Sequence, residues 1–344
     1  MTTLIQAINS RIEDDFSSVK FNEENFQRIE YLIQNRDKII TRKSKFLEAF
    51  EEFVDSIIKI EIKDNKVYSF YDIHDFLGRK KQIVDLINKA VEYNLSKGRK
   101  IPNTTIYFGT KDSHNFYEPE LPIFVLAKPQ NEPGLLFPDN TFDNWDQDRD
   151  DILNNCKKVE KEPIMFFRGA NTGDKKHNLR KILSKDKKFT NAKILISKEK
   201  VPQYTFCKYK YLLNLPGIAP WSYRFKYLFL MKSLIINVAL KVKRKNTTQD
   251  KWIQFFDTYF VAGEDYIEAD YYWGDSLDRR EQMNNYIKIK NKLLKIYKYY
   301  ENNNEEYEKI VKSGYNKIKK ISSEVVYSTI YKIIKKYCKI KNKN

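Results

Sequence analysis

The chain has 344 residues, with 63 Lys and Arg against 46 Asp and Glu, which gives a formal charge of +17 at pH 7. Hydrophobic residues make up 41% of it, including 24 Tyr and 22 Phe, so general disorder, collagen-like repeats and coiled-coil fibres are excluded. The length accommodates one large domain or two of medium size. The positive charge favours polyanionic partners but does not decide the fold.

The cysteines and the two ends of the sequence predict the compartment in which the protein works. Cys156, Cys207 and Cys338 are far apart and odd in number. We therefore expect no disulfide framework, no cysteine-based zinc site and a reducing compartment. The sequence shows no signal peptide, no retention or lipidation signal, and no apolar run of the ~18 residues that a membrane span requires. These features predict a soluble, cytoplasmic protein without a membrane span.

The element pattern changes near residue 103. Before it, apolar residues recur every three or four positions and predict a mainly helical region. After it, short apolar runs bounded by Gly, Pro and polar residues predict buried strands at 104–108, 121–126, 164–167, 192–196, 211–215 and 234–238. Helical stretches between them are predicted at 143–155, 175–184 and 222–232. This alternation is typical of βαβ units and parallel sheets with helices on both faces.

The end of the chain is predicted to be helical again. Asn303 and Glu306 have the spacing of a capping box, and Gly314 is predicted to end a helix. A last long helix is predicted from the apolar stripe Ile318, Ile321, Val325, Ile330, Ile333 and Ile334. The Lys- and Glu-rich residues 157–162 are the candidate domain boundary.

The first candidate site segment is 165–173, where an apolar strand ends at Arg168 and Gly169. A polar loop containing Thr172 then leads into a helix containing Arg180. Ligands of open α/β sheets bind outside the carboxyl ends of the strands, where Gly lets the backbone approach a phosphate. The alternative for this segment is an ordinary turn with a surface Arg.

The second segment, 207–230, runs from a buried strand through Pro216 and Gly217 to a predicted helix start. Ser222 is placed at the helix N-cap, and Arg224 and Lys226 fall in the first turn. A helix N-terminus carries free N–H groups and partial positive charge, and Arg grips phosphate oxygens in a bidentate way. The segment is therefore a candidate diphosphate site, the alternative being an amphipathic helix with a solvated basic start.

The third segment, 107–114, places Asp112 and His114 after a strand end. A carboxylate in this position is a candidate general base. The alternative is a turn-forming Asp, with His114 as a loop or packing residue.

Taken in chain order, the three segments resemble glycosyltransferase family 90, the capsule-associated and protein O-glucosyltransferase family. Its core contains an aromatic-Arg-Gly motif, a Cys-Lys-Tyr-Lys-Tyr-Leu segment, a Ser-x-Arg-Phe-Lys helix start and an apolar strand that opens with Ser. Here these are Phe167 to Thr172, Cys207 to Gly217, Ser222 to Lys226 and Ser233 to Ile236, and Trp252, Phe255 and Phe256 match a further element. The resemblance covers about residues 100–320.

The resemblance implies an α/β protein of GT-B type, in which two Rossmann-like domains face across a cleft and the last helix crosses back to the first domain. Residues 1–158 form the acceptor-side domain, with helix 318–344 on it, and residues 159–317 form the UDP-sugar domain. Asp112 maps onto the family's catalytic Asp. The nucleotide-diphosphate region corresponds to Arg168, Gly169, Thr172, Arg180, Gly217, Ser222, Tyr223 and Arg224.

The implied activity is inverting transfer of a sugar, glucose or xylose, from a UDP-sugar to a hydroxyl of a glycan or protein acceptor. Arginines and a helix N-terminus can replace a divalent ion in stabilising the leaving diphosphate, so we expect no cofactor and no metal requirement. Asp112 is expected to deprotonate the acceptor hydroxyl.

Two positions depart from the family. Ser113 and His114 follow Asp112 where the family often has an aromatic residue and Pro, and residues 265–268 replace its His-Tyr-Ile-Pro strand. The second departure predicts altered donor selection or packing. The unpaired cysteines and missing secretory signals also distinguish the chain from secretory members that glucosylate EGF-like domains.

Three alternatives remain open: a metal site at a DxD pattern, a nucleic-acid-binding protein, and an inactive relative. Asp146 and Asp148 form a DxD pattern that can bind a metal, although their surroundings favour the acidic start of a helix. His74, His114 and His177 lack the spacing of a zinc site. The lysine- and tyrosine-rich region 280–344 suits a nucleic-acid-binding protein, but no recognised nucleic-acid motif is present and compositional bias also explains the lysines. An inactive, UDP-binding relative is the third alternative.

Overall fold

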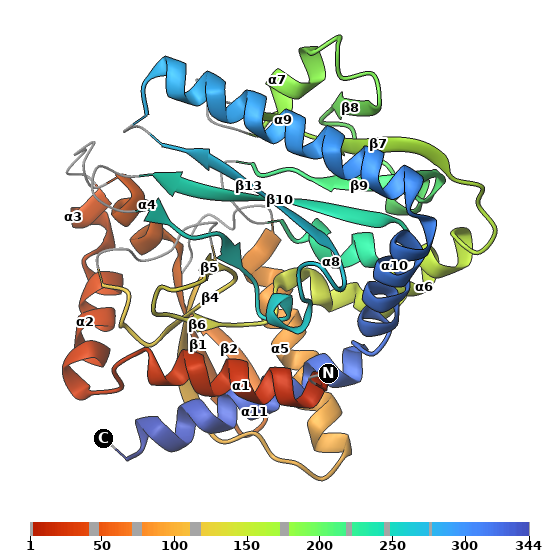
Figure 1. The fold of residues 1–344 in the computed structure, drawn as a ribbon. Helices are drawn as coiled ribbons and strands as arrows, with labels where there is room; N and C mark the ends of the chain where they lie inside the picture. Colours follow the sequence, from red (N-terminus) through yellow and green to blue (C-terminus); the bar gives the residue numbers. More distant parts are fainter. Residues whose placement is uncertain are drawn as a thin grey trace. The chain divides into compact units, whose positions relative to one another are not determined.

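The computed structural model describes residues 3–40, 48–70, 78–110, 118–172, 179–217, 222–243, 248–274 and 277–343 (Figure 1). The chain divides into two units. Unit 1 comprises Met1–Trp145, Ile253–Tyr259 and Ile321–Asn344, and unit 2 comprises Asp146–Trp252 and Phe260–Lys320. The last helix therefore belongs to the same unit as the N-terminal half of the chain.

Unit 1 is a mixed α/β unit. Its helices are α1 Leu4–Ser17, α2 Glu23–Gln34, α3 Arg36–Ile40, α4 Glu48–Ser56, α5 Arg79–Ser96 and α11 Ser323–Lys341, with 3-10 turns η2 Asn140–Asn144 and η4 Asp257–Tyr259. Its strands are β1 Ile57–Lys63, β2 Lys66–Phe70, β3 Thr104–Gly109, β4 Ile123–Val125, β5 Lys128–Pro129 and β6 Leu135–Leu136. The main sheet has the order β2-β1-β3-β4-β6, antiparallel at β1 and parallel from β3 onward.

The N-terminal region holds a β-hairpin as well as helices, so the prediction of a mainly helical first hundred residues was incomplete. β1 and β2 are joined by Asp64 and Asn65, which both have positive φ, 51° and 59°. Two such residues form the turn that matches the twist of paired strands. Ile58, Ile60 and Ile62 are fully buried and alternate with charged residues, which is the period of a strand.

Helix α11 supplies much of the core of unit 1. It packs on α5, and its Tyr337 is fully buried among Phe16, Phe21 and Phe124. The Tyr337 hydroxyl donates to the Pro122 carbonyl oxygen at 3.1 Å, so the buried polar end of the ring is satisfied. The predicted apolar stripe is confirmed at Ile330, Ile333 and Ile334, which are buried in α11. The predicted helix start at 318 was wrong, because Ile318 ends α10 and α11 begins at Ser323.

Unit 2 alternates strands and helices. Its strands are β7 Glu162–Gly169, β8 Ala192–Ile196, β9 Tyr209–Asn214, β10 Leu234–Lys243, β11 Thr248–Gln249 and β13 Ile267–Trp273, and β12 Trp252–Ile253 lies where the chain passes between the units. Its helices are α7 Leu179–Lys185, α8 Arg224–Phe229, α9 Arg279–Asn302 and α10 Asn304–Ile318, with η3 Gln203–Lys208; α6 Trp145–Asn155 begins at the unit boundary. The predicted strands and the α/β class are confirmed.

The sheet of unit 2 is parallel except at its short edge strand β11. The parallel strands lie in the order β8-β7-β9-β10-β13, so the chain places β8 on one side of β7 and all later strands on the other. Helices α9 and α10 cover one face, along the buried side chains of Phe167, Tyr211, Leu213 and Ile236 (Figure 1). This is the doubly wound topology, and its strand order reverses between β7 and β9.

Two predicted helix signals were wrong. Gly314 does not end a helix but lies inside α10, where a Cβ would meet the Asp265 carbonyl oxygen at 2.6 Å and the Phe229 ring at 2.7 Å. Asn303 precedes α10 but makes no side-chain cap, since its backbone is not in the extended conformation of a capping residue. Close packing explains the first position, and backbone geometry the second.

The cysteine prediction was also wrong, because Cys156 and Cys207 form a disulfide in unit 2. They are 51 residues apart in sequence and their Cα atoms lie 5.6 Å apart. Sequence distance does not report spatial distance, and the end of α6 returns beside η3. Cys338 is free and buried. None of the helices in the described ranges is long and apolar enough to cross a membrane.

Candidate active site

The candidate site lies at the carboxyl ends of β7 and β9 in unit 2. Residues 169–172 follow β7, and Leu215, Pro216 and Gly217 follow β9. The strand order reverses between these two strands, which makes them the switch point of the sheet. Ligands of doubly wound sheets bind at such a point, outside the carboxyl ends of the strands.

Two arginines from different helices meet the ring of Phe167 at this edge. The Arg180 guanidinium, from α7, lies 5.0 Å from the ring centroid, and that of Arg224, from α8, lies 5.1 Å away. Phe167 is 1% exposed, so the ring is a fixed surface that orients both cations.

Arg180 is held by hydrogen bonds from both strand ends. Its Nη1 donates to the Ala170 carbonyl oxygen at 2.9 Å and to Thr172 Oγ1 at 2.6 Å, and its Nη2 donates to the Leu215 carbonyl oxygen at 2.8 Å. The side chain therefore ties the β7 loop to the β9 loop. Its Nε is buried and makes no hydrogen bond.

No carboxylate balances this pair within the described part of the chain. Burial, and next the charge of Arg224, lowers the pKa of Arg180 from 12.5 to about 10. Burial likewise lowers the pKa of Arg224. Two partly or fully buried cations that repel one another are normally paired with an anion. The geometry therefore describes a site for an anionic ligand.

Two glycines allow this close packing. A Cβ on Gly169 would lie 3.0 Å from Nη2 of Arg224, and one on Gly217 would lie 2.8 Å from Thr172 Oγ1 and 3.2 Å from Arg180 Nη2. These are closer than real Cβ contacts, so side chains at either position would displace the arginines. Gly169, Thr172, Arg180, Gly217 and Arg224 are thus brought together.

Arg168 lies apart from this group. Successive side chains of a strand point to opposite faces, and Arg168 follows Phe167 in β7. Its Nη2 donates to Glu199 Oε2 at 2.8 Å and to Ser197 Oγ at 3.2 Å. The structure therefore gives Arg168 an ion-pair partner, unlike Arg180 and Arg224.

The start of α8 differs from the prediction. The N-cap residue is Tyr223, which has helical dihedrals and makes no side-chain cap, so the predicted N-cap at Ser222 was wrong. Ser222 Oγ still accepts a hydrogen bond from the Arg224 N–H at 3.3 Å. Tyr223 is 46% exposed. Because α8 has only six residues, the arginines and not a helix terminus supply the positive charge.

The remaining candidates lie elsewhere. Asp112 is outside the described residues; β3 ends at Gly109, three positions before it. His74, His114 and His177 also lie outside them. Asp146 and Asp148 lie in the first turn of α6, as predicted for an acidic helix start, where they bond Arg149 and Tyr227. The described residues contain no cluster of three or more His, Cys, Asp or Glu suited to a metal ion.

Sequence reasoning overlooked Phe167 and the Leu215 carbonyl oxygen. The aromatic position of the Phe-Arg-Gly motif signalled the first, because a strand residue two positions before Gly169 faces the same side as that glycine. No sequence pattern signals which backbone carbonyl an arginine will bond.

Comparison with known proteins decides the family. Residues 109–344 match glycosyl transferase family 90. The chain belongs to this family. The matched region contains all the site residues described above, together with Asp112.

The names of similar relatives describe O-glucosyltransferases. Protein O-glucosyltransferase 1 of Rattus norvegicus is 25% identical over 193 residues, which is 46% of each chain. Its Homo sapiens counterpart is 26% identical over 171 residues, covering 40% of this chain and 41% of the relative. O-glucosyltransferase rumi of Drosophila melanogaster is 27% identical over 166 residues, covering 39% and 38%. The chain thus spans less than half the length of these relatives.

Proposed function

We propose that this family 90 member is a glycosyltransferase that uses a UDP-sugar and binds its diphosphate at Arg180 and Arg224. The observation that carries the proposal is the pair of arginines at the switch point of the sheet, both over Phe167 and without a carboxylate in the described residues. A diphosphate supplies the missing negative charge, and each guanidinium offers paired N–H donors to phosphate oxygens.

The proposed chemistry follows from where charge develops. When the bond from the anomeric carbon to the diphosphate breaks, its electron pair goes to a β-phosphate oxygen, and the fixed guanidinium groups stabilise that oxygen. This arrangement supports a reaction without a divalent cation. Asp112, after β3, is the proposed base that removes the proton of the acceptor hydroxyl as its oxygen attacks the anomeric carbon.

In-line attack with a general base inverts the anomeric centre, and we include inversion and a GT-B arrangement of the two units in the proposal. The glucosyltransferase names of the relatives favour glucose as the sugar, with xylose as the competing donor because it differs by one hydroxymethyl group. A hydroxyl of a glycan or protein is the proposed acceptor.

Binding of UDP tests the site directly. UDP should raise the melting temperature of the wild-type chain, because a ligand that binds only the folded state stabilises it. Arg224→Ala should weaken UDP binding about 10- to 150-fold, the effect of losing a charge-assisted hydrogen bond of about 1.5–3 kcal/mol. Arg280→Ala, at an exposed position of α9, is the control for charge. Equal UDP affinity in all three proteins would refute the assignment.

Turnover tests the activity. A panel of UDP-sugars, offered with and without simple glycan acceptors, should show UDP release with one preferred donor, and release should continue in EDTA. Loss of release in EDTA with recovery in Mn²⁺ would contradict metal independence. UDP binding without release from any donor would identify an inactive relative.

A further inference from the structure

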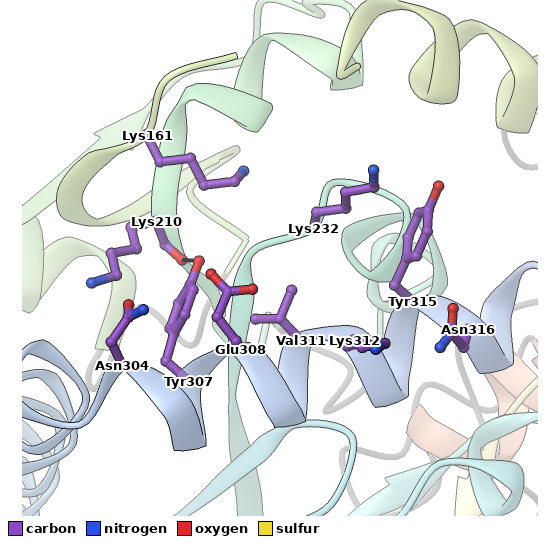
Figure 2. A pocket seen from close by; sticks show the side chains of 10 residues that line it. All are labelled: Lys161, Lys210, Lys232, Asn304, Tyr307, Glu308, Val311, Lys312, Tyr315 and Asn316. Atoms are coloured by element: carbon purple, nitrogen blue, oxygen red, sulfur yellow. Dashed lines mark hydrogen bonds between the residues drawn. The ribbon is translucent and has the colours of Figure 1, made fainter. Parts of the chain in front are cut away.

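A second basic cavity lies at the opposite edge of the unit 2 sheet. It has a volume of about 690 Å³, and its lining includes Lys161, Lys210, Lys232 and Lys312 and one carboxylate, that of Glu308 (Figure 2). Lys161 precedes β7, Lys210 lies at the start of β9 and Lys232 precedes β10. These are the amino ends of three strands, and the helices that carry Arg180 and Arg224 follow the carboxyl ends of two of them, β7 and β9. At about 3.3 Å per residue, β7 separates the two regions by roughly 20 Å.

The wall opposite Lys161 and Lys232 is one face of α10. Tyr307, Val311 and Tyr315 are spaced four residues apart and therefore share a face, with Glu308 beside them (Figure 2). Lys210 lies 4.8 Å from the Tyr307 ring centroid, and Lys232 lies 4.8 Å from that of Tyr315. The rings hold two of the cations at the cavity wall.

Most of the cavity's cations have no acidic partner in the described residues. Lys210 pairs with Glu301 at 2.8 Å. Lys161 donates to neutral acceptors only: the carbonyl oxygens of Cys207 at 2.6 Å and Met231 at 2.9 Å, and Ser233 Oγ at 2.9 Å. Burial, and next the charge of Lys232, lowers the pKa of Lys161 from 10.5 to about 8, although Glu308 raises it. The cavity thus has excess positive charge.

Lys232 is held in place by an unusual backbone conformation. Its φ is 51°, in the left-handed region that residues other than Gly and Asn rarely adopt. The neighbouring residues Met231 and Ser233 are buried. Such strain persists where neighbouring structure imposes it and is frequent at functional sites. Lys232 and Tyr315 also line an adjoining cavity of about 340 Å³, which adds Lys157, Lys319 and one carboxylate, that of Asp150, which pairs with Arg149 at 3.2 Å. Lys232 and Tyr315 thus belong to the walls of both cavities.

We propose that these adjoining cavities bind a small polyanion, a ligand with clustered phosphate or sulfate groups, at a site separate from the diphosphate site. The charge comes from lysines on three strand ends and on α10, a helix from the lysine- and tyrosine-rich part of the sequence. The ammonium group of lysine is a compact charge with three N–H donors, so it can bind phosphate or sulfate oxygens in many orientations.

The cavity favours a compact ligand over a nucleic acid. Its volume lies in the range of small-molecule sites. Binding of single strands relies on open aromatic faces for stacking bases, whereas Tyr307 is 3% exposed and Tyr315 has both Lys232 and Lys319 near its ring. The ligand can be a free phosphate compound or a phosphate- or sulfate-bearing saccharide, and both present the same groups.

Calorimetry with inorganic pyrophosphate and a sulfated disaccharide tests this site. Lys232→Asn with Lys312→Gln removes two cations, and Asn tolerates the left-handed backbone at 232. Lys298→Gln with Lys309→Gln removes the same charge from exposed positions outside the cavities. The first pair of substitutions should lower the affinity for at least one of the two probes by about tenfold and leave the affinity for UDP unchanged. The second pair should change neither affinity.

The outcomes separate this site from the diphosphate site. Arg224→Ala should weaken UDP binding about 10- to 150-fold but leave the lysine-dependent binding of the probe in place, so either site can fail alone. Tighter binding of the disaccharide assigns the site to an anionic glycan, and tighter binding of pyrophosphate to a free phosphate compound. Equal effects of the two lysine pairs, no saturable binding of either probe, or tighter binding of a short single-stranded oligonucleotide would overturn the proposal.

Discussion

Arg180 and Arg224 lower the stability of the fold when no anion is bound between them. A cation whose pKa is lower in the folded state, about 10 for Arg180 against 12.5, reduces folding stability at all pH values below the folded pKa. That cost disappears only as the pH rises above about 10. At neutral pH it is present in full, and an anionic ligand removes it.

Replacing one cation should therefore stabilise the protein without ligand. Arg224→Met keeps an unbranched side chain over Phe167 but removes the charge that repels Arg180. We expect a higher melting temperature in the absence of UDP and no further increase when UDP is added, measured by differential scanning calorimetry. A lower melting temperature without ligand would mean that the Arg224 guanidinium stabilises the fold.

The proposed role of Asp112 as a base can be tested by measuring UDP binding and sugar transfer separately. Asp112→Asn is isosteric but cannot accept the acceptor proton, so sugar transfer should fall at least about 100-fold. UDP should still raise the melting temperature as in the wild type, because the proposed diphosphate site is made of residues of unit 2, whereas Asp112 belongs to unit 1. An Asn variant with normal transfer would exclude Asp112 as the base.

Individual site residues were partly predictable. The glycines and arginines at strand ends were found because Gly and Arg in these positions suit phosphate, and the structure brings Gly169, Thr172, Arg180, Gly217 and Arg224 together. Strand alternation places Arg168 on the other face, which a count from Phe167 would have shown. The bond from Arg180 to the Leu215 carbonyl was not predictable, since it depends on the conformation of the β9 loop.

At the scale of elements, an unusual buried ion pair connects the segment before β13 to α10. The Asp265 side chain is 0% exposed and lies 2.5 Å from Lys317 Nζ. It also accepts from Ser313 Oγ at 2.6 Å and from the Val261 N–H at 2.7 Å. These contacts fix α10 where Gly314 lies against the Asp265 backbone, so Asp265 has a packing role.

Breaking this pair from one side should be costly. Asp265→Asn removes the fully buried carboxylate that accepts from Lys317 and should lower the free energy of unfolding by about 3–5 kcal/mol in denaturant titrations. Adding Lys317→Met should recover part of that loss, because it removes the charge that Asp265 balances. If the double variant is as unstable as the sum of the single ones, the two residues are not coupled.

Elements were predicted best where burial made the sequence pattern simple. Four of the five parallel strands of unit 2, β7 to β10, are short apolar runs bounded by Gly, Pro or polar residues, and these were found. β13 was not predicted, because Glu268 and Asp270 interrupt its apolar residues. The hairpin β1–β2 was overlooked although Ile58, Ile60 and Ile62 alternate with charges, because the surrounding helical pattern dominated. Gly314 was read as a helix end because its reason for being Gly, contact with Asp265 and Phe229, is tertiary.

At the scale of the whole molecule, the charge of +17 has two structural explanations of different kinds. Among the residues that the structure describes, two arginines have no acidic partner at the carboxyl edge of the unit 2 sheet, and several lysines have none at its amino edge. Many other lysines form ordinary ion pairs, as Lys290 does with Asp186 and Lys241 with Asp270. Net charge alone could not locate these two regions, because pairing depends on the fold.

The disulfide gives a final prediction for the whole chain. Closing a loop of 51 residues between Cys156 and Cys207 restricts the unfolded chain, an effect of about 4 kcal/mol. Cys156→Ser should lower the melting temperature by roughly 10 °C, whereas Cys338→Ser, at a buried free cysteine, is the control that leaves the loop closed. Reductant should lower the wild-type melting temperature to that of Cys156→Ser and leave that variant unchanged. A wild-type melting temperature that is insensitive to reductant would show that the bond does not contribute to stability, and the cysteine argument for a reducing compartment would then regain its support.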